Sequence, residues 1–194
     1  MQLHMPDFTT PRLLIRRLCM DDLTDIHRIL DLEVPEGGSR EHRSAWLEWT
    51  VHNYDALERL YQPPYGERAV RLRESGELIG AVGLVPELNF FAQIPGLGPD
   101  PKPRLPARFS QPEVGLFWTI ALAHRGQGYA TEAACAMVEF AFNQLSLAHI
   151  VATTRYDNLA SQAVMRRLGM RVERNPFAEP PFLQVVGILI NPHA

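Results

Sequence analysis

The chain has 194 residues, of which 46% are hydrophobic and 21% are charged. This length fits one domain with a core of its own, and the apolar content is too high for a disordered chain. The formal net charge of −3 offers no overall positive field to a phosphate backbone, which argues against a nucleic-acid partner.

The N-terminal half is predicted to contain a strand and two helices. Residues 12–18 are strand-like, and Asp21 or Asp22 is placed to cap a helix with an apolar stripe at helical spacing. A break at residues 37–39 precedes a second helix predicted over residues 40–60. Because residues 1–10 lack a continuous apolar run, we expect no signal peptide and no membrane span, and therefore a cytoplasmic protein.

A β-hairpin and a proline-rich segment follow. Residues 68–73 and 78–85 are predicted strands joined by a tight turn at residues 74–76. Residues 88–112 contain six prolines, which leave little backbone able to join a helix or a central strand. A structureless insertion of this length is uncommon inside a compact domain and is often functional.

The C-terminal half alternates strands and helices. Residues 113–121 form an almost continuous apolar run, typical of a central strand, and residues 131–145 indicate a largely buried helix. A short helix over residues 160–168 can be capped by Asp157 or Asn158 and closed by Gly169 in the left-handed conformation. Further strands are predicted over residues 150–154, 170–173 and 184–190.

The two cysteines, Cys19 and Cys135, both lie in apolar periodic segments. Neither has a partner at metal-ligand spacing, so no metal site is predicted. We expect both to be buried free thiols rather than a disulfide or a catalytic nucleophile.

The most informative segment joins the central strand to the buried helix. It reads Arg125-Gly126-Gln127-Gly128-Tyr129-Ala130-Thr131. Glycines allow close approach of a ligand, and successive N–H groups at a helix N-terminus favour an anion such as a diphosphate. A connection that binds nothing is the alternative. A dinucleotide motif would need a third glycine where Thr131 stands, and a nucleotide P-loop would need a lysine that is absent.

Arg125-x-x-Gly128-x-Ala130 resembles the coenzyme A signature of the GNAT acetyltransferases, Gln/Arg-x-x-Gly-x-Gly/Ala. It also occupies that family's place between the fourth strand and the third helix. Ordered matches to other family segments occur at residues 11–16, 80–83, 113–115, 158–161 and 167–170. Together they span nearly the whole chain and are most similar to the RimJ/RimL-type subgroup, whose members resemble ribosomal-protein N-terminal acetyltransferases.

The resemblance implies the acyl-CoA N-acyltransferase fold, an α/β (α+β) domain over residues 1–194 with an insertion at about residues 88–112. Its mixed, mostly antiparallel twisted sheet would have six to seven strands and about four flanking helices. Acetyl-CoA would be the co-substrate, without a metal. The residues implied to bind it are Trp118, Thr119 and Ile120 for the pantetheine arm, the amides of Arg125, Gly126, Gln127, Gly128, Tyr129, Ala130 and Thr131 for the pyrophosphate, Asn158 for the arm, and Ser161 near the phosphates.

Amide formation from a thioester needs a neutral amine, a donor for the developing oxyanion and a proton for the leaving thiolate. Glu113 is the preferred base, although a surface charge at a strand end is an alternative reading. By resemblance, the N–H of Ile120 would be the oxyanion donor. Many relatives carry a tyrosine as the acid where this chain has Met165, so no tyrosine is carried over. His124 and Tyr129 flank the turn and are weaker catalytic candidates.

The acceptor wall of relatives corresponds to a segment rich in aromatic and acidic side chains, namely Trp46, Trp49, Tyr54, Tyr61, Glu33, Glu36 and Glu41. Such groups suit a cationic amine, although the tryptophans can equally belong to the core and the acids to a solvated face. We expect an N-acetyltransferase that acts on a protein N-terminal α-amine or a small amine by direct attack in a ternary complex. A non-catalytic acyl-CoA-binding module such as a sensor and a plain structural domain are the alternatives. A homodimer is one assembly that the resemblance allows.

Overall fold

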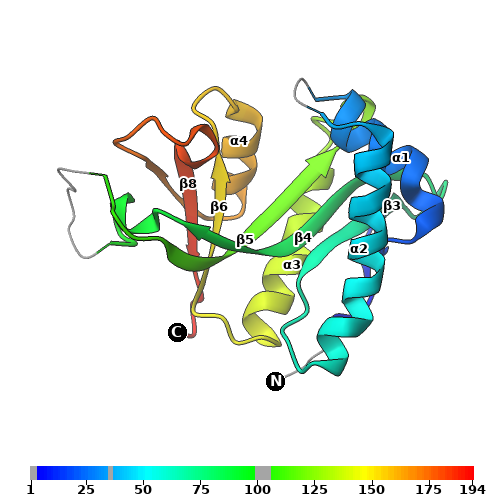
Figure 1. The fold of residues 1–194 in the computed structure, drawn as a ribbon, viewed down its shortest axis with the longest axis horizontal. Helices are drawn as coiled ribbons and strands as arrows, with labels where there is room; N and C mark the ends of the chain where they lie inside the picture. Colours follow the sequence, from blue (N-terminus) through cyan, green and yellow to red (C-terminus); the bar gives the residue numbers. More distant parts are fainter. Residues whose placement is uncertain (1–3, 35–36, 99–105) are drawn as a thin grey trace. The chain divides into compact units, whose positions relative to one another are not determined.

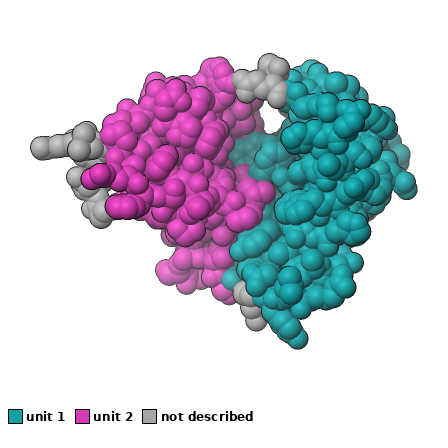
Figure 2. Space-filling model, in the orientation of Figure 1, with its two compact units in different colours: residues 1–84, 117–145 teal, residues 85–116, 146–194 magenta. Residues whose placement is uncertain are grey.

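The computed structural model describes residues 4–34, 37–98 and 106–194. The chain forms two compact units, which Figure 2 colours separately. Unit 1 comprises residues 1–84 and 117–145, and unit 2 comprises residues 85–116 and 146–194. Strands β4 (Leu78–Asn89) and β5 (Gln111–Ile120) each run through both units.

Eight strands of the described chain form one sheet in the order β1-β2-β3-β4-β5-β6-β8-β7, as labelled in part in Figure 1. The remaining strands are β1 (Phe8–Thr9), β2 (Leu13–Arg17), β3 (Gly66–Leu72), β6 (His149–Thr154), β7 (Arg171–Arg174) and β8 (Val185–Ile190). The sheet has one strand more than the expected six to seven. The additional strand is β1, which has only two residues and is therefore too short to leave an alternating pattern in the sequence.

The three antiparallel strands β2, β3 and β4 support two helices in unit 1. These are α1 (Leu23–His27), extended by a π-helical turn at Arg28–Leu32, and α2 (Arg40–Arg59). Ser39 caps α2, because its hydroxyl accepts the N–H of His42. The core between these elements consists of Leu18, Ile26, Ile29, Leu47, Ala69, Leu78, Ala81 and Ala121. The expected β-hairpin and second helix are confirmed.

Asp22 does not cap α1 as expected. It ends a 3-10 turn, Met20–Asp22, and its carboxylate accepts the N–H of Cys19 at 2.9 Å. Two hydrogen bonds of 2.7 Å from Arg16 hold the same carboxylate. The acidic residue therefore stabilises the turn before the helix and anchors β2, rather than satisfying the first N–H groups of α1.

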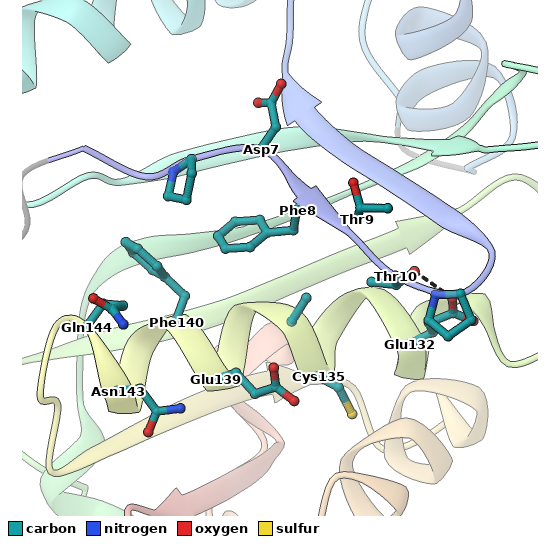
Figure 3. Close-up of a pocket in the computed structure, with 13 residues that line it drawn as sticks. Asp7, Phe8, Thr9, Thr10, Glu132, Cys135, Glu139, Phe140, Asn143 and Gln144 are labelled. Atoms are coloured by element: carbon teal, nitrogen blue, oxygen red, sulfur yellow. Dashed lines mark hydrogen bonds between the residues drawn. The ribbon is translucent and has the colours of Figure 1, made fainter.

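Helix α3 (Tyr129–Asn143) also belongs to unit 1 and is buried along one face by Ala133, Ala134, Met137, Phe140 and Ala141. Cys135, Glu139 and Asn143 are exposed on the same helix, and Figure 3 shows α3 beside β1, with Phe140 directed toward Phe8. A cavity of about 810 Å³ between the two is lined by Phe8, Glu132, Cys135, Glu139 and Phe140, among others. The expected burial of the thiols is wrong, because Cys135 is exposed and Cys19 is half-buried, although both are free.

Unit 2 contains β6, β8 and β7, with α4 (Leu159–Arg167) packed against them. Strand β5 pairs with β6 in parallel at Gly115↔Val151, whereas β6 and β7 both pair with β8 in the antiparallel sense. The core of this unit contains Phe91, Ile94, Val151, Leu183, Val186 and Ile188. Four α-helices thus accompany a mostly antiparallel sheet in the described chain, which confirms the predicted α/β fold class.

The proline-rich insertion is shorter than predicted. Strand β4 continues to Asn89 instead of ending at residue 85, and β5 begins at Gln111. Pro86 is tolerated in β4 because the last β3–β4 pair is Gly66↔Leu84, so the missing N–H removes no bond from that ladder. A 3-10 turn occupies Phe91–Gln93, and residues 99–105 lie outside the described residues.

Within the described residues, no helix is long and apolar enough to cross a membrane.

Candidate functional site

The segment that joins β5 to α3 contains two residues with positive φ. After β5, the chain makes a 3-10 turn at Leu122–His124 and then reaches Gly126 at φ 77° and Gly128 at φ 85°. Gly128 is the N-cap of α3. An L-residue with a side chain is strained in this left-handed region, which explains why glycine occupies both positions.

The turn exposes a series of unused backbone donors. The N–H of Arg125 donates to Leu122 O, and the N–H of Glu132 donates to Gly128 O. Between them, the N–H groups of residues 126–131 have no acceptor within the described parts of the chain. A Cβ added to Gly126 would meet nothing within 4 Å, so a ligand can approach this backbone closely. Six free donors at the N-terminus of a 15-residue helix are an arrangement that suits an anion.

The side chains of Arg125 and Thr131 differ in their contacts. The Arg125 guanidinium folds back to donate to Ile120 O at 2.8 Å, which ties the turn to the end of β5. The hydroxyl oxygen of Thr131 is buried and has no hydrogen-bond partner among the described residues. His124 contacts Glu77, with 3.0 Å between Nε2 and Oε1. The geometry therefore brings the β5 end and the turn together within unit 1.

Arg12 fixes the turn from the start of β2, a role that the sequence pattern did not reveal. Its Nη1 donates to Gln127 O at 3.0 Å, and its Nε donates to Glu132 Oε2 at 2.6 Å. The guanidinium also lies 4.4 Å from the ring centre of Tyr129. Burial opposes the charged form of Glu132, but hydrogen bonds from Thr10 and Arg12 outweigh it and lower the pKa of this carboxyl. Figure 3 shows the Thr10–Glu132 bond.

We expect Arg12→Ala to weaken acetyl-CoA binding roughly tenfold, since it removes charge-assisted bonds that order the turn. Arg73→Ala is the matched control, because Arg73 is also exposed but donates to the carbonyls of Thr10 and Pro11 instead of the turn. Isothermal titration calorimetry with acetyl-CoA measures the affinity of both variants. Equal affinities in the two variants would contradict this role of Arg12.

The strand residues predicted to face the pantetheine arm lie at the end of β5 in unit 1. Trp118 and Thr119 are half-buried, and Ile120 is buried. Gly80 of β4 packs against this segment so closely that an added Cβ would overlap Thr119 O and the Ile120 side chain. The lack of a side chain at Gly80 thus lets β4 and β5 approach each other beside the predicted oxyanion donor.

In unit 2, Asn158 and Ser161 are adjacent at the start of α4. The Asn158 side chain accepts the N–H of Ser161 at 3.1 Å, so the predicted helix cap is confirmed. Gly169 ends this helix region at φ 80°, as expected. Met165, which stands where many relatives carry tyrosine, is fully buried. Because its thioether carries no exchangeable proton, Met165 cannot replace the tyrosine as an acid.

Glu113 is a buried acceptor rather than a strand-end surface charge. Its side chain is 5% exposed, and His149 Nε2 lies 2.6 Å from its Oε2. Gln111 Nε2 donates to the other oxygen at 3.0 Å. His149 was not a predicted site residue. Its position beside Glu113 follows from the parallel register, because the pair Gly115↔Val151 places residue 149 beside residue 113.

A second carboxyl group, Glu87 of β4, was also missed by the sequence analysis. Burial, and then the charge of Glu113, raise its pKa from 4.5 to about 7. Glu87 has no hydrogen bond or ion pair with another described residue, and its carboxyl group fills the space where a side chain at Gly115 would lie. Glu87 was not predicted to lie in a strand, because the proline before it, Pro86, normally marks the end of a central strand.

The raised pKa of Glu87 makes stability dependent on pH. Between pH 4.5 and about 7, the unfolded chain has released a proton that the folded protein keeps, so the free energy of unfolding decreases as pH rises. Discounted for partial solvent contact, the shift corresponds to about 2 kcal/mol. We therefore expect Glu87→Gln to raise the free energy of unfolding by about 2 kcal/mol at pH 8 and hardly at pH 4. Urea denaturation at both values tests this, and an equal effect at both would contradict it.

The residues predicted to form the acceptor wall differ in their burial in the structure. Trp46 packs against the core of unit 1, whereas Trp49 and Tyr61 are 59% and 79% exposed. Tyr54 is buried, its hydroxyl accepts the N–H of Leu18, and burial raises its pKa to about 12. Glu33 accepts the N–H of Leu122, Glu41 is exposed, and Glu36 lies outside the described residues.

Comparison with known proteins identifies the family of this chain. A family model described as "Acetyltransferase (GNAT) domain" matches residues 12–171. The N-acetyltransferase YnaD of Bacillus subtilis strain 168, described as uncharacterized, is 39% identical over 61 residues, which are 31% of this chain and 35% of that protein. The FsC-acetyl coenzyme A-N(2)-transacetylase of Aspergillus fumigatus is 36% identical over 88 residues, 44% of this chain and 37% of that protein.

The chain thus spans about a third of the length of these curated relatives. Among solved structures, an acetyltransferase from Agrobacterium tumefaciens strain C58 aligns with a TM-score of 0.67 at 23% identity, covering 97% of this chain and 96% of that one. This likeness concerns the fold.

Proposed function

We propose that this chain, which belongs to the GNAT acetyltransferase family, transfers an acetyl group from acetyl-CoA to a primary amine. The observation that carries the proposal is the turn before α3, with free N–H groups from Gly126 to Thr131 and open space over Gly126. A pyrophosphate is the anion that this arrangement suits, because several backbone donors can converge on its oxygens at the positive end of a helix.

The remaining cofactor contacts are assigned by the same proposal. Trp118, Thr119 and Ile120 would pair with the pantetheine arm, while Arg125 holds the turn through Ile120 O. Asn158 would bond the arm and Ser161 would lie near the phosphates. We assign residues 1–194 to a single acetyltransferase domain.

Chemically, the amine nitrogen attacks the thioester carbonyl carbon, a C–N bond forms and the C–S bond breaks. The N–H of Ile120 would stabilise the oxyanion, and Glu113 would receive a proton from the amine. A proton must also reach the departing thiolate. Holding the two reactants in line can contribute about 7 to 11 kcal/mol, so strong acid catalysis is not required.

The acceptor class follows from proton chemistry. An α-amino group has a pKa of about 7.7 to 8.0 and is partly neutral at physiological pH, whereas a lysine side chain at about 10.4 is mostly charged. A protein N-terminus or a small amine therefore suits a site with a carboxylate base, in line with the RimJ/RimL-type resemblance.

Because both cysteines are free, we also place the protein in a reducing compartment, the cytoplasm.

A non-catalytic acyl-CoA-binding module is the second candidate. It is favoured by one observation, the buried Met165 at the position where many relatives carry an acidic tyrosine. A sensor would bind acetyl-CoA and release no thiol, whereas an enzyme would release one thiol for each acetylated amine.

The test is a thiol-release assay with acetyl-CoA and a panel of peptides with free N-termini, the same peptides with blocked N-termini, and small amines. Mass spectrometry identifies the acetylated product. The proposal predicts acceptor-dependent release with a mass increase of one acetyl group on an amine. Binding of acetyl-CoA without release for any acceptor would favour the sensor.

A further inference from the structure

Unit 2 contains two carboxyl groups, Glu87 and Glu113, that are near enough for the charge of Glu113 to act on Glu87. Glu113 lies on β5, and Glu87 of β4 occupies the volume beside Gly115, two residues further along the same face of β5. An added Cβ at Gly115 would overlap the Glu87 carboxyl group. Glycine at this position therefore makes room for a second carboxyl group next to the first.

The two carboxyl groups have very different partners. Glu113 is held by His149 at 2.6 Å and by Gln111 at 3.0 Å, so both of its oxygens have a donor. Glu87 has neither a hydrogen bond nor an ion pair with any residue that the structure describes, although it is partly buried. When two buried carboxylates repel each other, one proton resides on the member that lacks donors. Glu87 is that member, and the tendency agrees with its raised pKa.

We propose that Glu87 and Glu113 share one proton near neutral pH and act as a single unit that receives the proton of the attacking amine. This inference rests on the acetyl-transfer function proposed above. Glu113 is the member assigned to the amine, and Glu87 acts through it as a positioning residue that sets the proton affinity of the pair. Such a pair titrates in two coupled steps, and neither step belongs to one residue alone.

The proton balance of the reaction explains why a pair is useful. Formation of the C–N bond releases one proton from the amine, and cleavage of the C–S bond requires one proton on the thiolate. The pair takes up the first proton when both of its members are ionised, and returns it during the reaction so that the thiol leaves. An isolated, solvated glutamate with a pKa of about 4.3 is a much weaker base, whereas a pKa near the working pH is the optimum for a general base.

Among the residues that the structure describes, Gln111 and Gly115 of β5 and His149 of β6 lie against the two glutamates. Among these, His149 is the one cationic candidate, and its contact is with Glu113. His149→Gln keeps a donor but removes the imidazole ring that contacts Glu113. This variant should therefore alter the coupled titration without removing it.

The first experiment needs no activity and follows the glutamate side-chain carboxyl resonances of the free protein by ¹³C NMR across pH. One glutamate carboxyl should titrate between about pH 6 and 8 in the wild type. That titration should disappear in Glu87→Gln and persist in the control Glu139→Gln, which removes an exposed carboxyl from α3. If every glutamate carboxyl of the wild type titrates below about pH 5.5, the pair does not share a proton and the inference is overturned.

The second experiment measures turnover against pH with one amine acceptor, whose own ionisation is common to all variants. In Glu87→Gln, the acidic limb of the profile should move down by at least about one pH unit and the plateau should fall roughly tenfold. Binding of acetyl-CoA should stay unchanged. A superimposable profile would remove Glu87 from the reaction. Failure of the acetyltransferase proposal looks different, since the wild type itself would then neither bind acetyl-CoA nor acetylate an amine.

Gly115→Ala provides a second variant that tests the pair independently of Glu87→Gln. The added methyl group takes the space of the Glu87 carboxyl group while both glutamates remain in the chain. It should displace Glu87 and abolish the NMR titration near neutral pH. A titration that is unchanged in Gly115→Ala would show that the carboxyl group responsible is not the one beside Gly115, and would contradict the pair.

Discussion

Replacement of Gly128 by arginine is expected to reduce the affinity for acetyl-CoA at least about 100-fold, a loss of about 2.7 kcal/mol of binding free energy. Gly128 is the N-cap of α3 and has a φ of 85°. Its N–H is one of the free donors, and an added Cβ would lie 3.4 Å from Arg12 Nη2. An arginine side chain there would fill the space that the pyrophosphate needs.

Backbone strain alone could also weaken the protein, so a matched variant is needed. Gly169 has a φ of 80° at the end of α4, and the nearest atom to an added Cβ is Leu189 Cδ1 at 4.0 Å. Gly169→Arg therefore imposes comparable strain and the same added charge, far along the chain from the turn. We expect it to keep its affinity. If Gly128→Arg binds as well as Gly169→Arg, the turn is not the pyrophosphate site.

Glu113→Gln is expected to lower turnover about 100-fold near pH 7, which is the lower end of the contribution of a general base. The loss should become smaller at high pH, where the free amine is abundant and needs no base. Gln111 and His149 would still surround the isosteric amide, so the fold should persist. Steady-state rates from pH 6 to about 9.5 measure the effect.

Glu173→Gln of β7 is the control for this variant, since it makes the same chemical change at a half-buried glutamate of the same unit. Its turnover should match that of the wild type at every pH. A loss in Glu113→Gln that is the same at all pH values would remove the base role from Glu113 and leave only a structural contribution.

Most regular elements could be predicted from the sequence because their patterns are local. The apolar run of β5, the stripe of α3 and the cap at Asn158 each depend on residues within one or two turns or along one strand. The turn before α3 was recognisable for the same reason, since its glycines at positions 126 and 128 take the positive φ that only glycine adopts easily.

What the sequence could not predict depends on partners that are distant along the chain. Glu87 gained its raised pKa from burial and from Glu113, 26 positions further along, and Pro86 masked the strand that carries it. Arg12 reaches Gln127 across the sheet edge, which no local pattern indicates. Cys135 follows the apolar periodicity of α3 and is nevertheless exposed, because β1 lies beside that face without covering it.

The errors at element ends have the same origin. Asp22 looks like an N-cap, but Arg16 of the preceding strand and the Cys19 N–H take its carboxylate instead. Competition between local capping and a tertiary ion pair is decided by geometry that the sequence does not contain. Strand β1 exists because Phe8 and Thr9 find a partner in β2, not because two residues have a strong preference for a strand.

Calorimetric titration of the wild-type protein with acetyl-CoA tests the central claim most directly, with thiol release in the absence of acceptor measured as a control. The free donors of the turn predict saturable binding at one site, with a Kd below about 1 mM and little thiol release. Absence of binding at millimolar acetyl-CoA would contradict the account, because the turn would then be a connection between β5 and α3 and not the site of the acetyl donor.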